Sequence, residues 1–113
     1  MIMIYITCKD GEEARKIAIH LLDYKLIACA NIFPSNSLYK WENKLEDNKE
    51  MIIIAKSIKE KFNEIETEVK KMHSYKTPCI VMIQVSEGNK EYLDWVNDEL
   101  EWDGKQYFTL TWY

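Results

Sequence analysis

Hydrophobic and polar residues repeat along the chain with two distinct periods, and these periods predict its secondary structure. Three segments repeat apolar residues every three or four positions, which is the period of an amphipathic helix. Asp10 with Glu13 forms a capping box before the first segment. Ser57 with Glu60 forms one before the second, and Asn89 caps the third. The three apolar stripes are Ala14, Ile17, Ala18, Leu21 and Leu22; Phe62, Ile65, Val69 and Met72; and Tyr92, Leu93, Val96 and Leu100.

The other apolar segments are short and predict β-strands. The predicted strands are 1–7, 26–33 with a continuation at 37–41, 51–55, 79–85 and 107–113. Pro34 interrupts the second of them, which is typical of an edge strand or a bulge. The polar stretch 42–50 predicts the turn of a hairpin.

Strands and helices follow one another in the order βαββαβ, with a further helix at the C-terminal end. This order predicts an α+β fold with a ferredoxin-like antiparallel sheet. The chain has 113 residues and a mass of 13.5 kDa, so we expect residues 1–113 to form a single domain. There is no internal repeat and no segment with the composition of a linker.

Three of the predicted strands, 1–7, 51–55 and 79–85, are apolar at both odd and even positions. Right-handed crossovers place the first two helices on the same face of the sheet, so the other face would be left in water. Exposing six to eight such side chains would forfeit on the order of 10 kcal/mol. We therefore expect a homo-oligomer in which bare sheet faces meet; the alternative is a monomer whose C-terminal tail folds back over that face.

Composition and charge exclude several classes of protein. The formal net charge is −4 and the basic residues are scattered, so we expect no nucleic-acid partner. No apolar run is long enough to span a bilayer, so we expect no membrane association. Three cysteines at long spacings exclude a disulfide framework and a zinc knuckle, which predicts a reducing, cytoplasmic location.

Several chemically capable side chains are brought toward one end of the predicted sheet by connectivity alone. They are Cys8, Trp41, Glu42, His73, Tyr75 and Cys79. Cys8 and His73 offer a thiolate and an imidazole, which suit a soft metal such as copper. The alternative is structural: Cys79 is a small packing residue and His73 is a cation at a helix C-terminus.

A catalytic interpretation has less support. Cys8 lies near the start of a predicted helix, where a thiol pKa can fall, and His73 could serve as its base. No oxyanion motif accompanies them in the sequence. We therefore expect no catalytic residues and a protein that is not an enzyme.

Five motifs, taken in order over residues 2–100, resemble the CutA divalent-cation-tolerance family. They are Thr7-Cys8, Leu26-Ile27-Ala28-Cys29-Ala30-Asn31-Ile32, Ser37-x-Tyr39-x-Trp41-Glu42, His73-Ser74-Tyr75-Lys76-Thr77-Pro78, and Gly88 with Tyr92-Leu93-Asp94-Trp95. The resemblance implies a cytoplasmic homotrimer of ferredoxin-like subunits that serves tolerance of copper and other divalent cations, with no obligatory cofactor. It also implies that Cys8 and His73 are the metal ligands.

An alternative follows from the likeness of that trimer to the P-II signalling proteins. In it, a small molecule binds in clefts between subunits, with Trp41, Tyr75 and Cys79 as candidate cleft residues. Cys79 stands where the family usually has glutamate, an exchange that favours Cu(I) if a metal binds there. Residues 102–113 extend beyond the resemblance.

Overall fold

A four-stranded antiparallel sheet forms the frame of the protein in the computed structural model, which describes residues 1–100. The strand order is β2-β3-β1-β4. The strands are β1 (Ile2–Cys8), β2 (Cys29–Trp41), β3 (Lys44–Ser57) and β4 (Ile80–Gln84). The helices are α1 (Gly11–Asp23), α2 (Phe62–Met72), preceded by the short 3-10 turn η1 (Lys59–Lys61), and α3 (Lys90–Leu100). The strand predicted at 107–113 lies outside the described residues.

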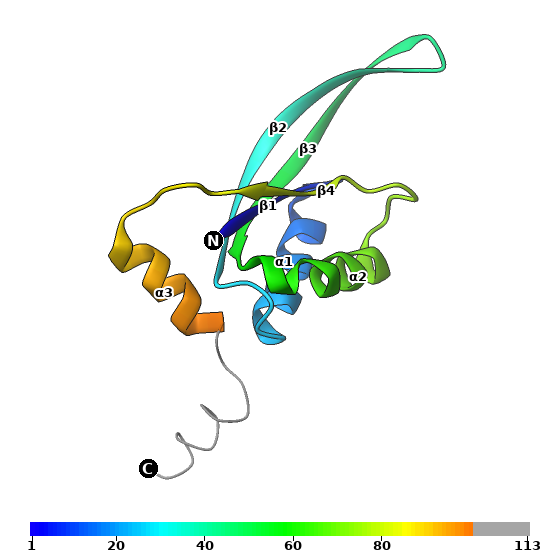
Figure 1. The fold of residues 1–113 in the computed structure, drawn as a ribbon. Helices are drawn as coiled ribbons and strands as arrows, with labels where there is room; N and C mark the ends of the chain where they lie inside the picture. The colour runs from blue at the N-terminus through cyan, green and yellow to red at the C-terminus, as the bar shows by residue number, and fades with distance from the viewer. Residues whose placement is uncertain (101–113) are drawn as a thin grey trace.

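The hydrophobic core lies between one face of the sheet and the helices α1 and α2, which lie on the same side of the sheet (Figure 1). Alternate residues of β1 point into this core and are fully buried, as the two-residue period of a strand requires. The helices contribute most of the stripes that their sequence period predicts, but Leu22 of α1 and Met72 of α2 are exposed and lie outside the core. The central members of the core are Ile2, Ile4, Ile6, Ala14, Ile17, Leu21, Ile65 and Val69.

The β2–β3 hairpin is much longer than its sequence suggests and projects beyond the rest of the sheet (Figure 1). Pairing runs without interruption to Trp41 and Lys44, and the turn consists only of Glu42 and Asn43. The predicted turn at 42–50 is therefore wrong, because backbone hydrogen bonds hold this polar and mostly exposed segment in a strand. Pro34 lies within β2, an edge strand, where its missing N–H is tolerated; the edge-strand prediction is confirmed.

The two predicted capping boxes have different outcomes. Asp10 caps α1 as predicted, since its Oδ1 accepts the Glu13 N–H at 2.8 Å. The box of Ser57 and Glu60 is wrong: Ser57 ends β3, is fully buried, and donates its hydroxyl to the Leu26 carbonyl at 2.6 Å. A buried hydroxyl with a tertiary partner is not free to cap a helix, and α2 begins after η1 without a side-chain cap.

The face of the sheet turned away from α1 and α2 is apolar and is only partly covered in the single chain, where α3 contacts part of it. Val81 and Ile83 of β4 lie opposite Tyr5 and Met3 of β1 on this face. Val81, Ile83 and Phe33 remain 47%, 43% and 39% exposed. The two-sided apolar pattern of the strands therefore corresponds to a real hydrophobic surface.

Candidate functional site

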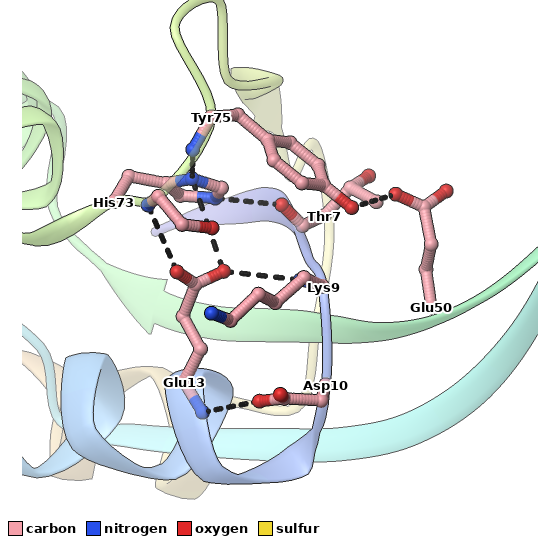
Figure 2. A network of polar contacts seen from close by, with 8 residues as sticks. Thr7, Lys9, Asp10, Glu13, Glu50, His73 and Tyr75 are labelled. Atoms are coloured by element: carbon pink, nitrogen blue, oxygen red, sulfur yellow. Dashed lines mark hydrogen bonds and ion pairs between the residues drawn. The ribbon is translucent and has the colours of Figure 1, made fainter.

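A polar network forms where the end of β1, the start of α1 and the loop after α2 converge (Figure 2). Its central group is the carboxylate of Glu13, in the first turn of α1. This carboxylate accepts the backbone N–H of Lys9 at 3.0 Å and that of Ser74 at 2.8 Å. Burial alone would raise the pKa of Glu13, but these hydrogen bonds outweigh it and hold the pKa below its ordinary value. Glu13 is thus an ionised anchor between two loops.

The side chain of His73 is fully buried beside this carboxylate. Its Nε2 lies 2.8 Å from the carbonyl oxygen of Thr7, which can only accept, so Nε2 carries the proton. Its Nδ1 accepts the backbone N–H of Tyr75 at 3.0 Å and lies 3.9 Å from Glu13 Oε1. Both ring nitrogens of His73 are therefore hydrogen-bonded to backbone groups.

Cys8 ends β1 and its thiol is fully buried. Burial, followed by the negative charges of Glu13, Asp10 and Glu50, raises the pKa of the Cys8 thiol to about 12. The pKa of the Cys8 thiol is therefore raised, whereas a nucleophilic cysteine requires a lowered pKa, so this geometry does not favour a catalytic role for Cys8. Proximity to the α1 N-terminus is outweighed by burial and by the surrounding carboxylates.

Donor atoms of Cys8, Glu13 and His73 lie within 4.8 Å of one another. Within residues 1–100 this is the one group of three or more such side chains close enough to share a metal ion. Connectivity predicts the convergence of Cys8 and His73, and the structure does bring them together. The sequence indicates Glu13 only as part of a capping box. Glu13 is the third residue of the helix, and a side chain at that position points back toward the end of β1.

The residues predicted to line a cleft gather on the other side of β1. Trp41, Tyr75 and Cys79 line an open concavity of about 650 Å³ below the projecting hairpin, together with Tyr39, Glu46 and Glu50. The Tyr75 hydroxyl donates to Glu50 Oε2 at 2.5 Å (Figure 2), and burial together with this bond raises the pKa of Tyr75. The polar residues around Glu50 predict a turn, so no local pattern indicates that Glu50 lines this concavity. Cys79 belongs to the concavity and not to the three-donor group.

Comparison with known proteins identifies similar chains over most of the length. The family model of the CutA1 divalent ion tolerance protein matches residues 2–99. A divalent-cation tolerance protein CutA of Archaeoglobus fulgidus is 51% identical over 98 residues, covering 87% of this chain and 96% of that protein. A protein of the same name from Pyrococcus horikoshii is 38% identical over 99 residues, covering 88% and 97%. None of these descriptions names a signalling protein, so the P-II-like alternative is not favoured.

A solved structure from Archaeoglobus fulgidus superposes with a TM-score of 0.85 at 50% identity, covering 88% of this chain and 99% of that one. That protein is described as a periplasmic divalent cation tolerance protein CutA. The cytoplasmic location predicted from the sequence is contradicted by this description and is wrong. An odd, widely spaced set of cysteines excludes a disulfide framework, but it does not fix a compartment. Within the described residues, no helix is long and apolar enough to cross a membrane.

Proposed function

The chain belongs to the CutA1 divalent ion tolerance protein family, and on this premise we propose that it binds a metal ion, copper above all, without catalysing a reaction. The observation that carries the proposal is the group of Cys8, Glu13 and His73. Sulfur and imidazole nitrogen are donors that copper prefers, and the carboxylate adds negative charge. The three residues come from β1, α1 and the loop after α2, so an ion bound there would join three segments.

The site must open before it can bind. In the metal-free arrangement the Cys8 thiol is protonated and both nitrogens of His73 have hydrogen-bond partners. Nδ1 is the nitrogen on the Glu13 side, and it becomes available once the Tyr75 N–H turns away. Binding through Cys8 would release the thiol proton, so affinity for the metal rises with pH.

A copper titration of the wild-type chain and of Cys8→Ser and His73→Ala tests the proposal. We expect each variant to bind copper at least about tenfold more weakly, because each removes one ligand. Cys29→Ser is the matched control: this cysteine contacts Tyr92 of α3 and lies outside the group, so affinity should not change. Titration of the wild type in buffers of different ionisation enthalpy should detect the release of one proton for each copper ion bound. This proton release should be absent in Cys8→Ser. Identical binding by all four proteins, or by none, contradicts the assignment.

We propose further that the subunit is ferredoxin-like and assembles as a homotrimer. The strand order β2-β3-β1-β4, with helices in both crossovers, supports the first part. The exposed part of the apolar face, with Val81, Ile83 and Phe33, supports the second. We also propose that residues 1–113 are one domain, with 102–113 an extension beyond the family match.

A further inference from the structure

The concavity below the β2–β3 hairpin, which the proposed metal site leaves unused, combines aromatic rings with carboxylates. Tyr39 and Trp41 extend from one face of β2, and Tyr75 comes from the loop after α2. Glu46, directly opposite Tyr39 in the ladder, and Glu50 come from β3. No lysine, arginine or histidine lines this concavity in the described part of the chain. Its lining is therefore aromatic and negatively charged.

Glu50 is the most unusual member of this lining. Its residue is only 9% exposed, yet no cationic side chain among residues 1–100 lies within ion-pair distance of its carboxylate. Within residues 1–100, its carboxylate accepts a side-chain hydrogen bond from the Tyr75 hydroxyl. Burying a carboxylate without a countercharge is costly, so a cation bound beside Glu50 would be stabilised.

Two of the three rings are held in position before any ligand arrives. Tyr75 is fixed through its bond to Glu50, and the Tyr39 hydroxyl accepts the Asn48 side-chain N–H at 2.8 Å. Trp41 is 64% exposed and offers its surface to the concavity. Rings fixed in this way attract a cation through their electron-rich faces without an ordering cost at the moment of binding.

The chemistry of the lining favours an organic cation over a metal ion. Glu46 and Glu50 belong to no group of three donors within metal-sharing distance in the described chain. Aromatic faces hold weakly hydrated alkylammonium ions, which a carboxylate then neutralises. The volume of about 650 Å³ lies in the range of small-ligand sites. We propose that the hairpin concavity binds a small organic ammonium ion, with Glu50 as its countercharge and Tyr39, Trp41 and Tyr75 around it.

Calorimetric titration of the full chain with choline tests this proposal. The control ligand is dimethylbutanol, in which carbon replaces the charged nitrogen of choline at nearly unchanged shape. We expect saturable binding of choline and at least about tenfold weaker binding of dimethylbutanol, since only choline carries the charge. Equal binding of the two compounds, or saturation by neither, would overturn the proposal.

Variants separate the roles of charge and ring. Glu50→Gln keeps an oxygen for the Tyr75 hydroxyl but removes the charge, and it should weaken choline binding about tenfold or more. Trp41→Leu should weaken it as well, whereas Glu64→Gln, an exposed change on α2, should leave it unaltered. Circular dichroism of each variant establishes that it is folded. Equal affinity of wild type and Glu50→Gln would contradict the role of Glu50.

A lysine from a second copy of the chain offers the same ammonium chemistry, and native mass spectrometry distinguishes the two sources. If Glu50→Gln dissociates an oligomer while the wild type binds no choline, the partner of Glu50 is that lysine and the small-ligand proposal is overturned. We expect instead an unchanged oligomeric state. Choline binding should also persist in Cys8→Ser, so that failure of the metal site and failure of this one are distinguishable.

Discussion

Glu13 joins the start of α1 to the nearby end of β1 and to the loop after α2, which is distant in sequence, through a single ionised carboxylate. Its backbone N–H bonds to Asp10, and its carboxylate holds the N–H groups of Lys9 and Ser74. Hydrogen bonds to a charged, buried acceptor are stronger than those between neutral groups. The junction on which Cys8 and His73 depend is therefore stabilised by a residue that is ordinary in the sequence.

Replacing Glu13 by glutamine should lower the free energy of unfolding by about 1–3 kcal/mol, because one of two backbone N–H donors would face an amide N–H. Denaturant unfolding at neutral pH measures the change. Glu12→Gln is the matched control, since Glu12 is exposed and its ion pair within the described residues is with exposed Lys16. An equal decrease in the free energy of unfolding in Glu12→Gln and Glu13→Gln would contradict the role of the Glu13 network.

The pH dependence of this contribution has a definite sign. The folded-state pKa of Glu13 lies below the ordinary value of 4.5, so the folded chain binds its proton less tightly than the unfolded chain. The stabilisation is present above pH 4.5 and is lost as the pH falls through the folded-state pKa. The stability difference between wild type and Glu13→Gln should shrink over that acidic range.

At the scale of elements, the β2–β3 hairpin shows how a strand can form with little burial. Beyond Pro34 its residues are mostly exposed on both sides, and continuous backbone pairing keeps them extended. The two turn residues, Glu42 and Asn43, have φ angles of 51° and 65°. Positive φ at both central residues is the signature of a type I′ turn, for which glutamate is poorly suited and asparagine is well suited.

Glu42→Asn should therefore raise the free energy of unfolding by about 0.5–1 kcal/mol, because asparagine adopts positive φ at a lower cost. Thermal unfolding should show a melting temperature higher by a few degrees, and amide exchange within residues 35–49 should slow. Asp47→Asn, in the extended part of β3, controls for the loss of charge and should have little effect. An unchanged or lower melting temperature for Glu42→Asn would argue against a strained turn.

At the scale of the whole molecule, the exposed apolar part of the sheet and the projecting hairpin both point outward from the single chain (Figure 1). The core is complete on the helix side, where Ile4 and Ile6 are fully buried. On the opposite face Val81 and Ile83 stay exposed. Burial of such a surface against other copies would stabilise each subunit at about 25 cal/mol for each Å² of apolar area.

Val81→Lys should disrupt the proposed trimer, because it places an unpaired charge in an apolar interface. Light scattering after size exclusion should show a mass near 13.5 kDa for the variant and about three times that for the wild type. Ile19→Lys, at an exposed apolar position of α1, is the control and should keep the wild-type mass. A wild-type chain that is monomeric at micromolar concentration would contradict the trimer.

The sequence by itself determined the order of the elements within residues 1–100 and the family. Apolar periods located the central residues of α1, α2 and β1, since a residue buried against one neighbouring layer leaves a regular pattern. Short-range chemistry determined the Asp10 cap. The motifs around Cys8 and His73 identified the family, and topology was enough to place these two residues at the same end of the sheet.

The tertiary structure alone decided the state of the site residues. Whether Cys8 is a reactive thiol depends on burial and on carboxylates from other segments, which no local pattern records. Glu13 and Glu50 owe their roles to partners 61 and 25 positions away. The length of the hairpin could not be predicted from the sequence either. Hydrophobic periodicity arises from burial of one face, and most of the hairpin is exposed on both faces. Local pattern fixes which element forms where a segment buries one face, whereas contacts between distant segments fix protonation, pairing and available surface.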